Sequence, residues 1–308
     1  MGLFLQAVVG SRYERGRRTN RMLRLLKETG LLVKEAVLGF IEDDALGRGA
    51  AIAYYALFML VPVLLIVISV AAIAFGREAA EGSIVAQMSG LMGSKSAEAV
   101  QSMIDSANSP AGGTLAAILA LGATVLAVTG IFGEVQSALN MIWRVSPRSS
   151  TLSRLVRARL VSLGLVVVAG FLLMVSLAMS AGLAALGSYL KSTFPGLEVV
   201  TGVVEFVLSA ALTASLFAAM YKVLPDTPIT WRDVAVGAMV TTGLFQGGKY
   251  LIALYIGRSE IASSYGAAGA LIVVLLWIFY TAQIFLLGAE FTHAFAIRYG
   301  SHVSQDAT

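Results

Sequence analysis

Four ionisable side chains fall inside long apolar stretches, and these residues are the most able to do chemistry: Glu134, Glu205, Lys249 and Glu290. A charge in the hydrocarbon of a bilayer costs about 3 kcal/mol on the mildest scale, so such residues are usually paired or line a path for an ion or a polar solute. We expect Glu134 and Glu290 near the cytoplasmic ends of their helices, and Glu205 and Lys249 deeper. The chemistry to expect is the handling of a solute or an ion within a membrane.

Glu205 and Lys249 are predicted to meet. Glu205 lies about five residues, and Lys249 about eight, from the outer end of its apolar stretch, which at 1.5 Å per residue places both roughly 8–12 Å inside the outer face. Opposite charges at one level can neutralise each other, and this predicts an ion pair. The pair could act on a substrate or an ion, or it could be purely structural.

Polar residues follow the charged ones at helical spacing, so several apolar helices carry a polar stripe. If these stripes face inward, they outline a wetted cavity lined by the first, second, fourth, fifth and sixth membrane spans. The candidate residues of this cavity, besides the four charged ones, are Gln246, Gln283, Asn140, Tyr54 and Tyr55.

The alternative interpretation of the same residues is structural. Hydroxyl groups in membrane helices often only bond across packed helices, and tyrosines near a span's end are often interface anchors. Glu134 and Glu290 could cap a helix or pair with Arg144 or Arg148. Both interpretations stay open at this stage.

The elements that position these side chains are long apolar helices. Of the 308 residues 57% are hydrophobic and only 13% are charged, about half the charged fraction of a soluble domain. Six apolar stretches are long enough to cross a bilayer, over residues 49–76, 114–133, 160–187, 199–221, 234–257 and 266–290. The predicted fold class is all-α: a polytopic membrane protein with six transmembrane helices, an amphipathic interfacial helix over residues 20–42, and short extracytoplasmic helices between the first two spans.

The first apolar stretch has a proline near its middle. Pro62 leaves the carbonyl group of Phe58 without its usual backbone partner, which predicts a kink there. Asp43 and Asp44 precede this helix and are predicted to supply its N-cap. Thr230 and Asp233 fit a capping box at the start of the fifth span.

The distribution of basic residues predicts the orientation. Seventeen Lys and Arg residues fall on the side of the chain termini and four on the other side, so both termini are expected in the cytoplasm. The predicted organisation is a basic arm with an amphipathic helix over residues 1–48, a transmembrane domain over 49–297 with an extracytoplasmic segment at 77–109, and a cytoplasmic tail over 298–308. The basic charge is thus a topology signal, and membrane lipids rather than nucleic acid are the expected partners; a homo-oligomer stays open.

Four segments carry a resemblance to a known family: AIAYYALFMLVPVLL, EVQSALNMIW, PITWRD and SYGAAGALIVVLLWIFYTAQIFLLGAEF. In this order they resemble the YihY/BrkB family of bacterial inner-membrane proteins, over about residues 38–295. The resemblance implies a multi-pass protein of the bacterial inner membrane. Members of that family have been linked to serum resistance and to movement of lipid-linked material, and the family was once mislabelled ribonuclease BN.

The residues argue against the ribonuclease label. A metal-dependent nuclease needs several clustered ligands, whereas this chain has two histidines, His293 and His302, and no cysteine. We therefore expect no enzyme activity, no metal and no cofactor. A transporter or flippase for a lipid or amphiphilic solute is the favoured function, and a non-catalytic scaffold for envelope assembly is the alternative. The chain has no P-loop, so ATP-driven transport by this chain alone is not expected.

Overall fold

The computed structural model describes residues 27–107, 130–145, 198–258 and 267–300, together with the single helical positions 164, 170, 172 and 175. The described part of the chain is helical apart from short connections, so the all-α fold class is confirmed. Unlabelled helices cover residues 27–42 and 130–142. The labelled helices are α2 (Ala45–Phe75), α3 (Arg77–Met92), α4 (Ser94–Ala107), α7 (Glu198–Val223), α8 (Trp231–Arg258) and α10 (Ala267–Tyr299).

Three of the described helices are long and apolar enough to cross a membrane: Ala45–Ile73 of α2, Gly202–Val223 of α7 and Leu271–Tyr299 of α10. They correspond to the predicted first, fourth and sixth spans. Helix α8 covers the predicted fifth span but is not among the three. The predicted spans over 114–133 and 160–187 fall almost wholly outside the described residues, so the count of six spans and their orientation stay predictions.

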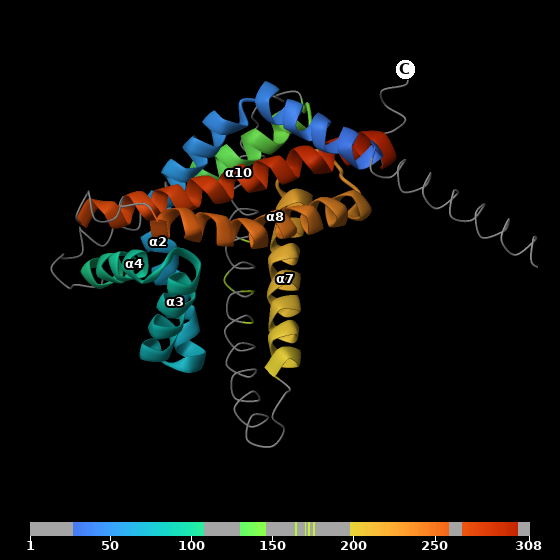
Figure 1. Cartoon of the computed structure of the whole chain (residues 1–308). Helices are drawn as coiled ribbons and strands as arrows, with labels where there is room; N and C mark the ends of the chain where they lie inside the picture. The colour runs from blue at the N-terminus through green and yellow to red at the C-terminus, as the bar shows by residue number, and fades with distance from the viewer. Residues whose placement is uncertain are drawn as a thin grey trace, which may run out of the picture.

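The helices pack around α10, which lies beside both α8 and α2. Helix α7 packs on α8, and in Figure 1 the two meet near the C-terminal end of α7 while its N-terminal end points away from α8. Helices α3 and α4 pack on each other and against α2, beside the N-terminal half of α10. The two ends of α10 thus contact different helices.

Two apolar cores follow from this arrangement. One surrounds the C-terminal half of α10, where Leu286 meets Leu139 of the helix over 130–142 and Tyr221 of α7. The other lies where α3 and α4 meet α2 and includes Ile104 of α4 and Trp277 of α10. Large apolar side chains also remain on the outside of α2, α7, α8 and α10. Such a surface suits contact with lipid rather than with water.

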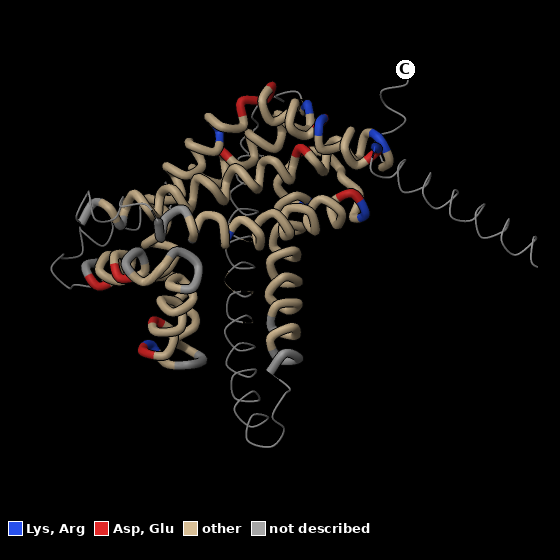
Figure 2. The backbone as a smooth tube through the Cα atoms, viewed as in Figure 1, with Lys and Arg blue, Asp and Glu red and all other residues tan. Residues whose placement is uncertain are grey.

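Charged residues are separated from this apolar surface. In Figure 2 they gather along the upper edge of the view, on the helix over 27–42 and its neighbours, and again on α3 and α4. Among the side chains of α7 that the structure describes, the charged one is Lys222, in its last turn. Because charges avoid hydrocarbon, this separation agrees with a protein embedded in a bilayer.

Glycines end helices α2 and α3. Gly76 (φ 81°) ends α2 and Gly93 (φ 87°) ends α3, both with a left-handed backbone that a side chain would strain. The sequence predicted two short helical patterns within 77–109, and α3 and α4 lie there. The side of the membrane on which they lie stays a prediction.

The two capping predictions had different outcomes. Thr230 receives the backbone N–H of Asp233 at 3.5 Å and donates its hydroxyl to the Asp233 carboxylate at 2.8 Å, so the N-cap bond of the predicted capping box is present. The N-cap prediction for α2 is correct in position but not in bonding. Asp44 occupies the N-cap position in a left-handed conformation (φ 50°) and makes no side-chain cap hydrogen bond, because Asp43 and Asp44 instead form a tight turn. Helix α2 runs from Ala45 to Phe75 through Pro62, and the kink there stays a prediction.

Candidate functional site

The polar stripe of α10 lies against glycines of three neighbouring helices. The Tyr280 hydroxyl rests on Gly248 of α8, the Gln283 amide on Gly49 of α2, and the Glu290 carboxyl group on Gly39 of the helix over 27–42. A Cβ atom at any of these three glycines would collide with the polar side chain above it. The stripe therefore faces the interior of the described helices and is held at close range by residues without side chains.

Gln283 is only partly satisfied in this position. Its Nε2 atom donates to the carbonyl oxygen of Leu46 at 3.4 Å, which joins α10 to the first turn of α2. Its Oε1 atom is buried and has no hydrogen-bond partner among the described residues. A buried amide oxygen without a donor costs about 1–3 kcal/mol, so this position has unused bonding capacity.

A cluster of charged residues lies about two helical turns further along α10. We name it the carboxyl cluster; its members are Glu42, Asp43, Arg144 and Glu290. Glu290 is 3% exposed and Asp43 is 4% exposed, and the Glu290 carboxyl group rests on Gly39, the residue whose carbonyl oxygen accepts the backbone N–H of Asp43. Arg144 Nη1 lies 3.0 Å from Asp43 Oδ1, and Arg144 Nη2 lies 3.9 Å from Glu42 Oε2.

Arg144 reaches this cluster from a left-handed backbone position (φ 52°). It follows the helix over 130–142, where the N–H of Val145 donates to Asn140 O at 2.8 Å and the N–H of Arg144 donates to Met141 O at 2.9 Å. This is the Schellman pattern, in which glycine is usual because a side chain costs about 1–2 kcal/mol there. Such strain is retained where the surroundings fix it, here through the ion pair with Asp43.

Glu134 has a different partner from the predicted ones. Its Oε1 atom lies 3.6 Å from Arg48 Nη1, which also donates to Ser137 Oγ at 3.4 Å. The structural alternative predicted Arg144 or Arg148 for Glu134; Arg144 is instead bound to Asp43, and Arg148 lies outside the described residues. The sequence reasoning missed Arg48, although it lies at the start of the first span.

Asn140 is held by the connection between α7 and α8. Its Nδ2 atom donates to Asp226 Oδ2 at 2.8 Å, and its Oδ1 atom accepts the backbone N–H of Asp226 at 2.8 Å. Gln136 adds a third hydrogen bond to Asp226 Oδ1 at 3.2 Å. This candidate cavity residue therefore ties two segments together, and Asp226, which is not among the predicted site residues, is its partner.

The deeper candidates lie on α7 and α8. Lys249 is half-buried, with its Nζ atom 5.8 Å from the centre of the Phe245 ring, close enough for a cation–π contact. Glu205 lies on α7, and its side chain is outside the described residues. Their ion pair stays a prediction, and it requires the N-terminal part of α7 to approach α8 more closely than it does in Figure 1.

Two neighbouring threonines of α8 differ in their bonding. Thr241 is fully buried, donates to Gly237 O at 2.8 Å and lies 2.9 Å from the Tyr221 hydroxyl. Thr242 is 6% exposed, and its Oγ1 atom has no partner among the described residues. Gln246, one turn further on, is buried as well. The Thr242–Gln246 face of α8 thus adds a second polar line to the interior.

Tyr54 and Tyr55 lie on the outside of α2. Their ring centres are 5.6 Å apart, and Tyr54 also packs edge-on against Phe58 at 4.9 Å. Both tyrosines are exposed, although the Tyr55 ring covers Gly130 of the helix over 130–142. The rings form an aromatic patch on the apolar surface rather than part of the buried stripe.

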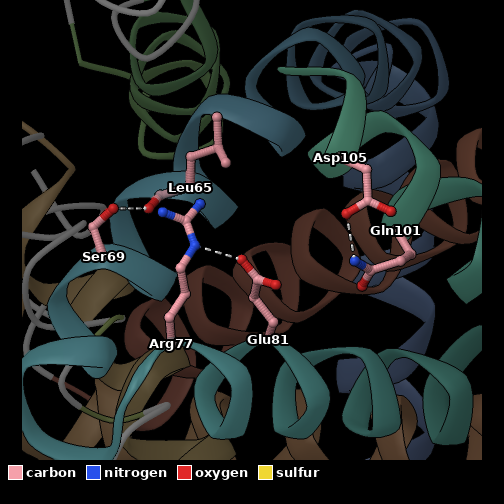
Figure 3. Close-up of polar contacts among 6 residues, drawn as sticks. All are labelled: Leu65, Ser69, Arg77, Glu81, Gln101 and Asp105. Atoms are coloured by element: carbon pink, nitrogen blue, oxygen red, sulfur yellow. Dashed lines mark hydrogen bonds and ion pairs between the residues drawn. The ribbon is translucent and has the colours of Figure 1, made fainter. Parts of the chain in front are cut away.

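The polar contacts around α3 and α4 are local. In Figure 3 Arg77 Nε lies 2.9 Å from Glu81 Oε1, and Gln101 Nε2 donates to Asp105 Oδ1 at 2.8 Å, each within one helix. Ser69 in α2 likewise donates to the carbonyl oxygen of Leu65, one turn back. None of these contacts joins one helix to another.

Comparisons with known proteins agree on one family. The family model of Virulence factor BrkB matches residues 36–308. A UPF0761 membrane protein of Psychrobacter sp. is 27% identical over 266 residues, covering 84% of this chain and 47% of that protein. Another, of Rhodospirillum centenum, is 31% identical over 270 residues, covering 85% and 56%. The chain thus spans about half the length of these relatives, and no solved structure matches it.

Proposed function

The chain belongs to the Virulence factor BrkB family of membrane proteins, as its YihY/BrkB resemblance indicated, and we propose that it is a transporter or flippase for a lipid or another amphiphilic solute. Residence in the bacterial inner membrane with both termini in the cytoplasm is part of this proposal. The relatives are named membrane proteins, and three described helices are long and apolar enough to cross a membrane.

The observation that carries the proposal is a set of unsatisfied oxygen atoms inside the helix packing. Thr242 Oγ1, Gln283 Oε1 and Glu290 Oε1 are buried and have no hydrogen-bond partner among the described residues. Each such atom costs about 1–3 kcal/mol unless something else bonds to it. Buried polar atoms of this kind mark places where water, an ion or a substrate group supplies the missing bond.

The amphiphilic character of the proposed substrate follows from what surrounds this polar interior. An amphiphile needs polar partners for its headgroup and an apolar surface for its chains. The stripe of α10 offers the first, and the exposed aromatic patch of Tyr54, Tyr55 and Phe58 on α2 offers the second. A solute that is polar throughout would gain nothing from the apolar surface.

The adjacent threonines of α8 provide a matched test. Thr242→Val removes an unpartnered hydroxyl at almost constant volume, so the protein should be as stable as the wild type or slightly more stable. If that hydroxyl bonds the moving headgroup, translocation of a fluorescent phosphatidylglycerol in liposomes should fall about tenfold, the effect of about 1.4 kcal/mol. Thr241→Val is the control, since its hydroxyl is fully used and its loss should lower stability.

The translocation rates of these variants test the transporter proposal. A stable Thr242→Val variant with reduced translocation supports the transporter. Wild-type protein that moves no labelled lipid above empty liposomes, or a Thr242→Val variant that moves it at the wild-type rate, would count against it.

A scaffold for envelope assembly is the second candidate, and one observation favours it. The polar stripe of α10 sits directly on glycines of the neighbouring helices, and both the amide nitrogen and the amide oxygen of Asn140 are hydrogen-bonded to Asp226. Polar groups packed this closely also hold helices together without moving anything. A scaffold would tolerate Thr242→Val without loss of envelope integrity in cells, whereas a transporter would not.

A further inference from the structure

Two buried carboxyl groups from different parts of the chain face each other in the carboxyl cluster. Asp43 comes from the turn before α2, and Glu290 comes from α10, 247 positions later in the sequence numbering. Both side chains are more than nine-tenths buried. The Glu290 carboxyl group rests on Gly39, whose carbonyl oxygen accepts the backbone N–H of Asp43, so Glu290 lies against the helical turn that leads to Asp43.

The hydrogen-bond donors around this pair are too few for two charged groups. Asp43 Oδ1 receives Arg144 Nη1 at 3.0 Å, but Asp43 Oδ2 and Glu290 Oε1 are buried without a donor among the described residues. Two ionised carboxylates can only accept hydrogen bonds, so they cannot bond to each other. A single proton on one of them turns two unsatisfied, repelling acceptors into a donor and an acceptor.

The other charged groups facing the pair do not remove this shortage. From the segment that carries Asp43, Glu42 adds a further negative charge, and Arg144 is the cation from the helix over 130–142. In α2, Arg48 is already paired with Glu134. On α10, His293 lies one turn from Glu290 with its ring 5.1 Å from that of Trp143.

The charged residue of α8 that faces α10 is Asp233, whose carboxylate accepts the Thr230 hydroxyl and lies against Gly300, ten residues beyond Glu290. Nearer to Glu290, the α8 residues that face α10 are Gly237, against Thr292, and Thr241, against Gly288. Neither residue titrates in the physiological range. The balance near Asp43 and Glu290 is therefore three carboxyl groups to one arginine.

We propose that Asp43 and Glu290 share one bound proton and form a proton-binding site between the turn before α2 and helix α10. When the proton leaves, the O–H bond of the carboxyl group breaks, its electron pair stays on the oxygen, and the proton passes to water. Two adjacent carboxylates then repel each other, and the one nearby arginine, Arg144, is bound to Asp43. Loss of the proton thus weakens the contact between residues 39–44 and α10, and binding of the proton restores it.

The sign of the effect on stability follows from proton linkage. The folded protein binds one more proton at neutral pH than the unfolded chain, whose carboxyl groups are ionised there. Stability is therefore greatest at low pH and falls as the pH rises through the range in which the folded site loses its proton. This behaviour is opposite to that of an ordinary carboxylate in an ion pair.

The experiment uses the purified full chain in detergent, with thermal unfolding measured from about pH 5 to about pH 9. Wild-type protein should lose stability across this range. Glu290→Gln keeps a hydrogen-bond donor for Asp43 but has no titrating proton. The loss of thermal stability that the shared proton causes as the pH rises should therefore be absent in Glu290→Gln, and also in Asp43→Asn. Glu134→Gln is the matched control, because it alters a carboxylate on a neighbouring helix that already has Arg48, and it should keep the wild-type pH profile.

An infrared spectrum supplies the second readout. Wild-type protein at neutral pH should show the carbonyl band of a protonated carboxyl group, which Glu290→Gln should lack and Glu134→Gln should retain. Absence of that band, or a pH profile that is the same in wild type and Glu290→Gln, would overturn the proposal. So would stabilisation by sodium but not potassium salts that Glu290→Gln abolishes, since the ligand would then be a metal cation. Both readouts are independent of lipid translocation, so failure here is distinguishable from failure of the transporter proposal.

Discussion

The two ends of α10 are held by different kinds of contact. At the C-terminal end, polar and charged pairs join separate helices. Arg298 of α10 pairs with Glu35, 263 positions away, and beside this end Asn140 joins the helix over 130–142 to Asp226, 86 positions away. At the N-terminal end, α3 and α4 pack on α2 and α10 through apolar side chains, and the ion pair of α3, Arg77 with Glu81, stays within one helix.

This difference shows where a change of charge state can move the protein. Apolar packing between α3, α4 and α2 does not depend on protonation or on ions. The other end of α10 has an apolar core as well, but the carboxyl groups, arginines and amides beside that core are partly unsatisfied and do depend on protonation or on ions. A solute or a proton that alters the structure should therefore act at the C-terminal end of α10 and leave the α3–α4 end unchanged.

The largest effect is expected in the apolar region. Ile104→Ala removes a fully buried side chain where α4 meets its neighbours, and it should lower the free energy of unfolding by about 4 kcal/mol. Ile73→Ala, at a highly exposed position of α2, is the control and should change it by less than about 1 kcal/mol. Denaturant titration of the purified protein measures both, and equal losses would mean that α3 and α4 are not held by apolar packing.

Loss of the arginine in the carboxyl cluster should have the next largest effect. Arg144→Ala leaves the buried Asp43 and Glu290 without a cation, which should cost about 3 kcal/mol, although it also removes a strained side chain. Arg77→Ala breaks an exposed pair one turn apart in α3 and should cost about 0.3 kcal/mol. If the two losses were similar, the contrast between the two ends of α10 would not hold.

A smaller loss is expected when an uncharged partner is removed. Asn140→Ala takes two hydrogen bonds from Asp226 and should lower stability by about 2 kcal/mol, mainly by separating the α7–α8 connection from the helix over 130–142. Gln101→Ala removes a comparable amide that bonds only within α4 and should cost about 0.3 kcal/mol. Hydrogen exchange should show faster exchange at residues 224–230 in Asn140→Ala alone, and unchanged exchange there would contradict the assignment.

The sequence predicted local features better than pairings. Apolar stretches and a capping box are encoded by neighbouring residues, so α2, α7, α10 and the Thr230–Asp233 cap could be foreseen. Partners far apart in the chain could not, because their meeting depends on how helices pack. The partners suggested for Glu134 therefore did not include Arg48, and Asp43 was taken for a cap when its carboxylate turns to Arg144.

The polar stripe of α10 was predictable from the sequence in part. Its helical spacing showed that Gln283 and Glu290 share a face with Tyr280, and this is a local property. That each side chain rests on a glycine from another helix is visible only in the folded chain. Gly39, Gly49 and Gly248 gave a signal of their own, since glycine is unfavourable within a helix and its presence often indicates close approach.

The central claim is that the buried polar face of α8 is wetted and open to a solute, and reactivity of a cysteine there tests it most directly. The chain contains no cysteine, so Thr242→Cys and Thr241→Cys each introduce a single thiol. In membranes, a charged, water-soluble thiol reagent should modify Thr242→Cys and leave Thr241→Cys unmodified, and added phosphatidylglycerol should slow the reaction. If both thiols stay unmodified, or both react at the same rate whether or not lipid is added, no wetted path runs along this face and the transporter account is contradicted.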